Sequence, residues 1–127
     1  MNREAQEIFD FIAKKTFSSL SDFDWKEANA VAKIITRYSE VEGDYKTDVA
    51  GKSFSYEVDD DVIASFKTLR DVMAKANDNE AWYTATIHIT SDGEFKFSFD
   101  YDNFPDFEYK PSDDKIKEEL EKYPRKQ

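Results

Sequence analysis

The sequence predicts an α+β fold: a single domain of residues 1–127 in which helices pack against a mostly antiparallel, four-stranded sheet. Three segments carry apolar residues at the three-to-four spacing of a helix, and others show the alternation of a half-buried strand. The chain is long enough for one hydrophobic core, and no Pro- or Ser-rich linker divides it. The predicted order is helix, strand, strand, helix, strand, strand, helix (α-β-β-α-β-β-α).

Residues 3–20 are predicted to form the first helix. Its apolar stripe at helical spacing consists of Ala5, Ile8, Phe11, Ile12 and Thr16, and charged residues occupy other positions. The polar cluster at residues 18–22 should end this helix.

Two strands are predicted next. Residues 29–40 begin with alanines that are compatible with a helix, but the β-branched and aromatic residues that follow favour a strand. A turn is expected at Glu42-Gly43-Asp44, with a return strand from Tyr45. Alternation over residues 53–58 predicts the end of that strand or a third short one.

The second helix is predicted to begin at Asp59-Asp60-Asp61, which supplies an N-cap and negative charge where the helix dipole favours it. Asn77-Asp78-Asn79 should end it. Its apolar stripe consists of Val62, Phe66, Leu69, Met73 and Ala76.

A hairpin is predicted from residues 83–90 and 94–101. A two-residue turn would mix apolar and polar side chains on each face, whereas the three-residue loop Ser91-Asp92-Gly93 keeps them apart. Gly93 should then take the left-handed conformation. The expected apolar pairs are Ile89 with Phe95, Ile87 with Phe97, Ala85 with Phe99 and Tyr83 with Tyr101.

The last helix is predicted over residues 115–122, capped by Pro111-Ser112-Asp113-Asp114 and ended by Pro124. Ile116 and Leu120 are its expected apolar stripe.

The composition restricts the function. A net charge of −10 opposes direct binding to nucleic acid, and it favours encounter with basic surfaces. The chain has no cysteine, no signal-peptide pattern at its start and no stretch long and apolar enough for a membrane span, which together predict a cytoplasmic protein.

The sequence predicts no enzyme, no cofactor and no metal site. His88 is the single histidine and lies on the polar face of the predicted hairpin, opposite Lys96. The sequence offers it no second imidazole and no nucleophile motif as a partner. The three glycines are too dispersed for a phosphate-binding loop. The acids after residue 100 resemble a calcium loop, but Pro105 and Pro111 stand where an EF-hand needs Gly and Glu.

The segment that follows the hairpin is the main candidate for a contact surface. Aromatic residues there alternate with acids, a composition that suits an interface with a basic partner. The alternative is that the aromatic residues fold back over the sheet while the acids face water. The predicted partner-binding residues are Asp100, Asp102, Phe104, Asp106 and Glu108, with Asp59, Asp60 and Asp61 as a second acidic patch.

Trp82, the hairpin from Ser91 to Tyr101 and the acids after it resemble the YezG-like immunity proteins, and the region from Leu20 to Trp25 is similar to their first Trp region. Those proteins are bacterial antitoxins of polymorphic, contact-dependent nuclease toxins. The chain departs from the family pattern after Tyr101, where a Pro-interrupted link leads to a short charged helix.

The resemblance implies a cytoplasmic immunity protein without enzymatic activity, whose partner is the catalytic domain of a cognate toxin. Occlusion of the basic active-site region of a nuclease is the expected mode of inhibition. The alternative function is a small-ligand-binding or regulatory α+β domain with an aromatic-lined pocket. The oligomeric state stays open at this point.

Overall fold

The computed structural model describes residues 3–49 and 51–125. It confirms the α+β class but contains five strands instead of the four expected, because residues 53–56 form a strand of their own. The elements are α1 (Arg3–Ser19), β1 (Glu27–Ile35), β2 (Tyr38–Lys46), β3 (Ser53–Tyr56), α2 (Asp60–Ala76), β4 (Thr84–Thr90), β5 (Phe95–Asp100) and α3 (Asp113–Lys122).

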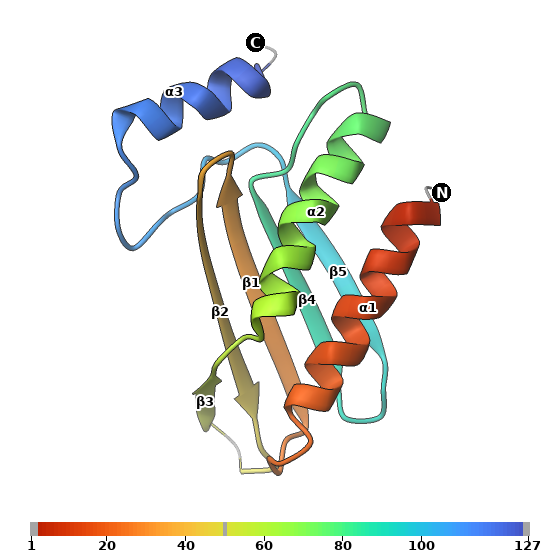
Figure 1. Cartoon of the computed structure of the whole chain (residues 1–127). Coiled ribbons are helices and arrows are strands. Elements are labelled where there is room, and N and C mark those ends of the chain that lie inside the picture. Colours follow the sequence, from red (N-terminus) through yellow and green to blue (C-terminus); the bar gives the residue numbers. More distant parts are fainter. Residues whose placement is uncertain (1–2, 50, 126–127) are drawn as a thin grey trace.

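The strands form one antiparallel sheet in the order β3-β2-β1-β4-β5. Figure 1 shows α1 and α2 side by side on one face of this sheet, and α3 beyond the end at which β1 turns into β2. The opposite face of the sheet carries no helix among the described residues. We call it the open face.

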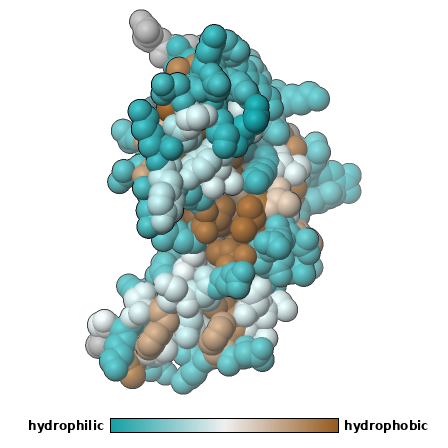
Figure 2. Space-filling model, turned by 60° about the vertical axis from the view of Figure 1, so that its left-hand side comes forward, coloured by the Kyte–Doolittle hydropathy of each residue, from teal (hydrophilic) through white to brown (hydrophobic). Residues whose placement is uncertain are grey.

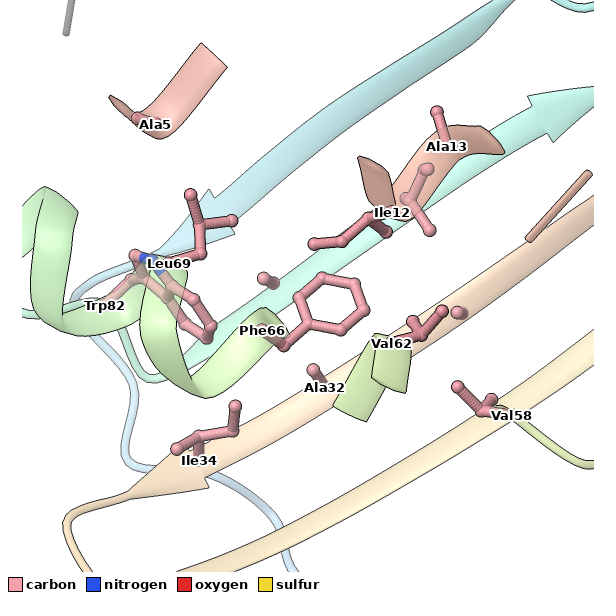
Figure 3. Packing of buried hydrophobic residues seen from close by; sticks show 13 residues of the cluster. Ala5, Ile12, Ala13, Ala32, Ile34, Val58, Val62, Phe66, Leu69 and Trp82 are labelled. Carbon is pink, nitrogen blue, oxygen red and sulfur yellow. The ribbon is translucent and has the colours of Figure 1, made fainter. Parts of the chain in front are cut away.

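The main core lies between the sheet and the two helices. Phe66 of α2 and Ile12 of α1 are fully buried above β1 and β4, and Trp82 closes the same cluster (Figure 3). Ala30 and Ala32 of the central strand β1 are also fully buried, and their small side chains leave room for the helices.

The predicted turn at Glu42-Gly43-Asp44 is wrong. β1 pairs with β2 from Ile35↔Tyr38 to Glu27↔Lys46, so the chain turns at Thr36-Arg37 and continues straight through Gly43. Gly43 serves a different purpose there, since a Cβ at this position would lie 2.5 Å from ring atoms of Tyr56. The glycine makes room for that ring.

The predicted hairpin is confirmed. Ile89 pairs with Phe95, Ile87 with Phe97 and Ala85 with Phe99, and Gly93 has a φ of +95°. The expected pair of Tyr83 with Tyr101 does not form, because the Tyr83 N–H donates to the Asp100 carbonyl oxygen (2.8 Å) and the ladder ends there.

The other helices begin as expected. The Asp59 carboxylate accepts from the Asp61 N–H at the start of α2, and the Ser112 hydroxyl accepts from the Lys115 N–H at the start of α3. The predicted stripe of α3 is wrong in part, since Leu120 is 46% exposed whereas its neighbour Glu119 is fully buried.

Glu119 is buried because it is the centre of a polar network that holds α3 on the domain. One carboxylate oxygen accepts from the N–H and the hydroxyl of Thr36 (2.9 Å each). The other accepts from the guanidinium groups of Arg70 (2.8 Å) and Arg125 (3.2 Å). Because both carboxylate oxygens have partners, the charged Glu119 side chain is tolerated in the interior. Its bonds to Thr36 stabilise the turn between β1 and β2.

Candidate partner-binding face

Strand alternation places polar side chains on the open face. The alanines of β1 and the apolar residues of β4 and β5 point to the helices, so every second residue points the other way. The residues that line the open face are Glu27, Asn29, Val31 and Lys33 of β1, Glu40, Glu42, Asp44 and Lys46 of β2, Ser53 and Ser55 of β3, Thr84, Thr86, His88 and Thr90 of β4, and Lys96, Ser98 and Asp100 of β5.

Three carboxylates follow one another on β2. Glu40, Glu42 and Asp44 lie two residues apart and therefore on the same side of the strand. Among the described residues, Glu42 and Asp44 form no ion pair, and Asp44 accepts a hydrogen bond from the Ser53 hydroxyl (3.3 Å). We call these three residues the acidic stripe.

Residues 101–111, the crossing segment, run from the end of β5 behind the sheet to α3 (Figure 1). Two open-face side chains hold the segment in place. The Lys33 ammonium group donates to the Asp106 carbonyl oxygen (2.6 Å). The Glu40 carboxylate accepts from the backbone N–H groups of Glu108 (2.7 Å) and Tyr109 (3.0 Å). The crossing segment therefore extends the acidic stripe.

These contacts shift the pKa of both side chains that meet at Glu40. Burial raises the pKa of Glu40, but the Tyr109 N–H, the Tyr38 hydroxyl and the Glu108 N–H outweigh it and hold the pKa below its ordinary value. The hydrogen bond to Glu40 (2.7 Å) raises the pKa of Tyr38 to about 12. The Glu40 carboxylate is thus ionised in the folded protein at neutral pH.

The structure divides the predicted residues of the crossing segment between structural and exposed roles. Asp100 closes a local turn, since its carboxylate accepts hydrogen bonds from the Asn103 side-chain amide and from the backbone N–H groups of Asp102 and Asn103. These bonds, above all the one from the Asn103 amide, lower the pKa of Asp100. The side chains of Asp102, Asp106 and Glu108 are exposed.

Phe104 is partly exposed, as expected of a contact residue, and partly folded back onto the domain, as expected under the alternative. It is 41% exposed, yet its ring contacts those of Tyr83 (5.5 Å) and Phe107 (6.0 Å). Phe107 in turn packs edge-on against Tyr38 (4.9 Å). Phe104 and Phe107 therefore fold back onto the domain, whereas Tyr109 is 70% exposed and Phe104 stays partly accessible.

Asp59, Asp60 and Asp61 lie elsewhere. They begin α2 on the helix-covered side, where α2 follows β3, whereas the crossing segment leaves the other end of the sheet (Figure 1). Lys15 of α1 approaches Asp61 at 3.6 Å. The two predicted acidic patches do not form one surface.

A shallow depression of about 240 Å³ opens in the acidic stripe. Its lining includes the aliphatic Val31, the carboxylates of Glu42 and Asp44, and Lys33, whose ammonium group is held by the Asp106 carbonyl oxygen. This combination suits the apolar stem and charged end of a lysine or arginine side chain.

His88 has a structural partner. It pairs with Lys96 across the hairpin, as expected, and its Nδ1 lies 2.8 Å from the Asn29 Oδ1. Within residues 3–49 and 51–125, no group of three or more His, Cys, Asp or Glu side chains is arranged to hold a metal ion.

The sequence prediction missed the acidic stripe because it placed a turn at Glu42-Gly43-Asp44. The signal was present, since acids at residues 40, 42 and 44 alternate with other residue types, as expected of a strand with one charged face. A glycine in a strand often marks close approach of another group, which here is the ring of Tyr56.

The fold and the open face show that this is a small acidic α+β domain. No described helix covers the open face of its sheet. Residues 6–126 match the family model described as Immunity protein YezG-like. The chain therefore belongs to the YezG-like immunity protein family. A search of curated proteins finds no significant match. In the described part of the chain, no helix has both the length and the apolar composition to cross a bilayer.

The hydrogen bonds from the backbone of the crossing segment to the Glu40 carboxylate should depend on pH. Because the pKa of Glu40 is lower in the folded state, its contribution to stability is present above the ordinary value of 4.5 and is lost as the pH falls through the folded-state pKa. We expect Glu40→Gln to lower the free energy of unfolding at neutral pH. The difference from wild type should close in acid, as measured by urea unfolding. A difference that is independent of pH would contradict this assignment.

Proposed function

We propose that the protein is an immunity protein that binds the catalytic domain of a cognate bacterial toxin and blocks it. The toxin is proposed to be a nuclease, neutralised in the cytoplasm, and the chain itself is proposed to have no enzymatic activity. One observation supports this most directly: a member of an immunity family carries the acidic stripe on a sheet face that no described helix covers, with an irregular aromatic and acidic segment fixed beside it.

The proposed mode of binding is electrostatic. A nuclease that holds nucleic acid needs a basic active-site region, and carboxylates arranged on a rigid surface can occupy it in place of phosphates. The acidic stripe and the exposed acids of the crossing segment supply that surface. The depression beside Val31 would take one basic side chain of the toxin.

Co-expression tests the function itself. Cells that express the toxin domain encoded next to this gene should stop growing, and this protein should restore growth. The purified pair should form a stable complex in which nuclease activity is inhibited. A toxin domain that stays fully active in the presence of excess protein would contradict the proposal.

Charge reversal tests the face. We expect the double variant Glu42→Lys and Asp106→Lys to associate with the toxin domain about ten-fold more slowly, or worse, at low ionic strength, because steering by opposite charge is lost. The association rate of the wild type should fall with added salt, and that of the variant should change less. Stopped-flow or surface plasmon resonance measures both.

The matched control is Asp22→Lys and Asp24→Lys, which changes the net charge equally in the exposed loop between α1 and β1. If both double variants slow association equally, the face is not the binding site and only net charge matters.

The alternative of a small-ligand or regulatory domain rests on an aromatic-lined pocket. The ring contacts instead place many of these side chains against one another, with Phe9 on Phe97 at 4.8 Å and Trp82 on Phe99 at 5.6 Å. These rings therefore pack in the core, and the aromatic side chains that line an apolar depression are Phe17 and Phe95.

A further inference from the structure

We propose that β5 is a self-association edge, at which two copies of this chain pair their β5 strands antiparallel and join their sheets into one. This inference concerns the edge of the sheet and does not depend on the identity of the toxin.

β5 is the last strand of the sheet, and its backbone groups alternate between two directions. The Thr90 N–H donates to the Glu94 carbonyl oxygen (2.9 Å), so Glu94 faces β4, as do Lys96, Ser98 and Asp100. The N–H and C=O groups of Phe95, Phe97 and Phe99 therefore point away from the sheet. No strand of the described chain lies on that side.

One register makes this edge complementary to itself. If Ser98 pairs with Ser98 of the second copy, then Lys96 lies opposite Asp100 of the second copy, and the two-fold symmetry repeats this opposite-charge pair. The outward backbone groups of Phe97 and Phe99 then face each other and form hydrogen-bonded pairs.

Neighbouring registers are worse. A slip in one direction places Phe97 opposite itself and Asp100 opposite Glu94 of the second copy. A further slip places Lys96 opposite itself. Like charges directly opposite each other destabilise a sheet. A slip in the opposite direction leaves only residues 98–100 to pair, because β5 ends at Asp100. The first register therefore combines the longer ladder with the opposite-charge pair.

The other edge of the sheet opposes self-association. β3 covers only Gly43–Lys46, which leaves residues 38–42 of β2 without a strand partner among the described residues. Figure 2, turned to bring this side of the molecule forward, shows hydrophobic surface between hydrophilic surfaces. A second copy paired with Glu40 or Val41 at the centre would place Glu40 opposite itself or opposite Glu42, and the acidic stripe repels it there. Pairing centred on Ser39 would join only residues 38–40, because β2 begins at Tyr38.

Apolar surface adjoins the β5 edge. Phe95 is 41% and Phe17 is 40% exposed, and both line an apolar depression of about 380 Å³ between α1 and β5. In the selected register, Phe95 lies beside the end of β5 of the second copy, which stops at Asp100. Pairing would thus cover apolar surface that is otherwise exposed to water. The acidic stripe, on β2, stays free to bind a partner.

Sedimentation equilibrium of the purified protein over a wide concentration range tests the inference. We expect the mass to rise from monomer to dimer with concentration. Lys96→Glu should shift this equilibrium to monomer by about ten-fold or more, because each dimer contains the ion pair twice and the variant makes both pairs repulsive. Lys52→Glu, an equal charge change at an exposed site near the other edge, should leave association unchanged.

Amide hydrogen exchange gives a second measurement. The N–H groups of Phe97 and Phe99 should exchange more slowly as the concentration rises, whereas those of Ser39 and Val41 should not. Three outcomes would each overturn the inference. The mass could stay monomeric at every concentration, the two lysine variants could have equal effects, or amide exchange at β5 could be independent of concentration.

Discussion

Replacement of Glu119 by alanine is expected to reduce the free energy of unfolding by about 3–5 kcal/mol, the usual cost of breaking a buried ion pair. The side chain of Glu119 is 0% exposed and that of Arg70 is 2% exposed. Without the carboxylate, the Arg70 guanidinium keeps its bond to the Trp82 carbonyl oxygen (2.6 Å) but remains buried without a counter-charge. Urea unfolding of the two proteins measures the difference.

Glu118→Ala is the matched control, one residue earlier on α3. Its ion pair with Arg37 (2.7 Å) joins side chains that are 37% and 62% exposed, and such surface pairs contribute about 1 kcal/mol or less. Equal losses in the two variants would show that α3 contributes through its surface and that the buried network adds little.

Gly43→Val is expected to cost about 1–3 kcal/mol, in spite of the preference of valine for strands, because overpacking displaces well-packed neighbours. The Tyr56 ring occupies the space that the new side chain needs. Burial raises the pKa of this tyrosine to about 12, in keeping with a ring held against the sheet. Thermal or urea unfolding measures the loss.

Two further variants isolate that cause. Ser39→Val makes a β-branched substitution on the same side of β2, away from Tyr56, and should change stability by about 0.5 kcal/mol or less. In the background of Tyr56→Ala, Gly43→Val should cost much less than alone, which gives a coupling energy between the two sites. An unchanged cost in that background would assign the effect to the backbone.

Local patterns predicted much of the fold. The apolar stripes of α1 and α2, the three aspartates at the start of α2 and the alternation of the β4–β5 hairpin are each encoded within a few neighbouring residues. The hairpin register was predictable because a slip of one residue would mix its faces.

The first half of the sheet was not predictable in this way. Glycine between two acids usually marks a turn, but the position of the turn depends on Glu119, which is 83 residues away from Thr36. The straight course of β2 depends likewise on Tyr56, which fills the space above Gly43. Neither partner is visible in the local sequence.

The candidate site shows the same division. The acids of the crossing segment were recognised by composition, and three of them are exposed. Their link to Glu40 and Lys33 joins residues about seventy positions apart, so the sequence did not identify the acidic stripe as their neighbour.

The sequence by itself determined the class of fold, the helices, the hairpin, the excess of acid and the resemblance to immunity proteins, because each follows from composition or from short-range periodicity. Only the tertiary structure decided which acids share a surface, why Glu119 instead of Leu120 is buried, and which sheet edge is left open. These outcomes depend on contacts between residues far apart in the chain, and such contacts leave no periodic pattern in the sequence.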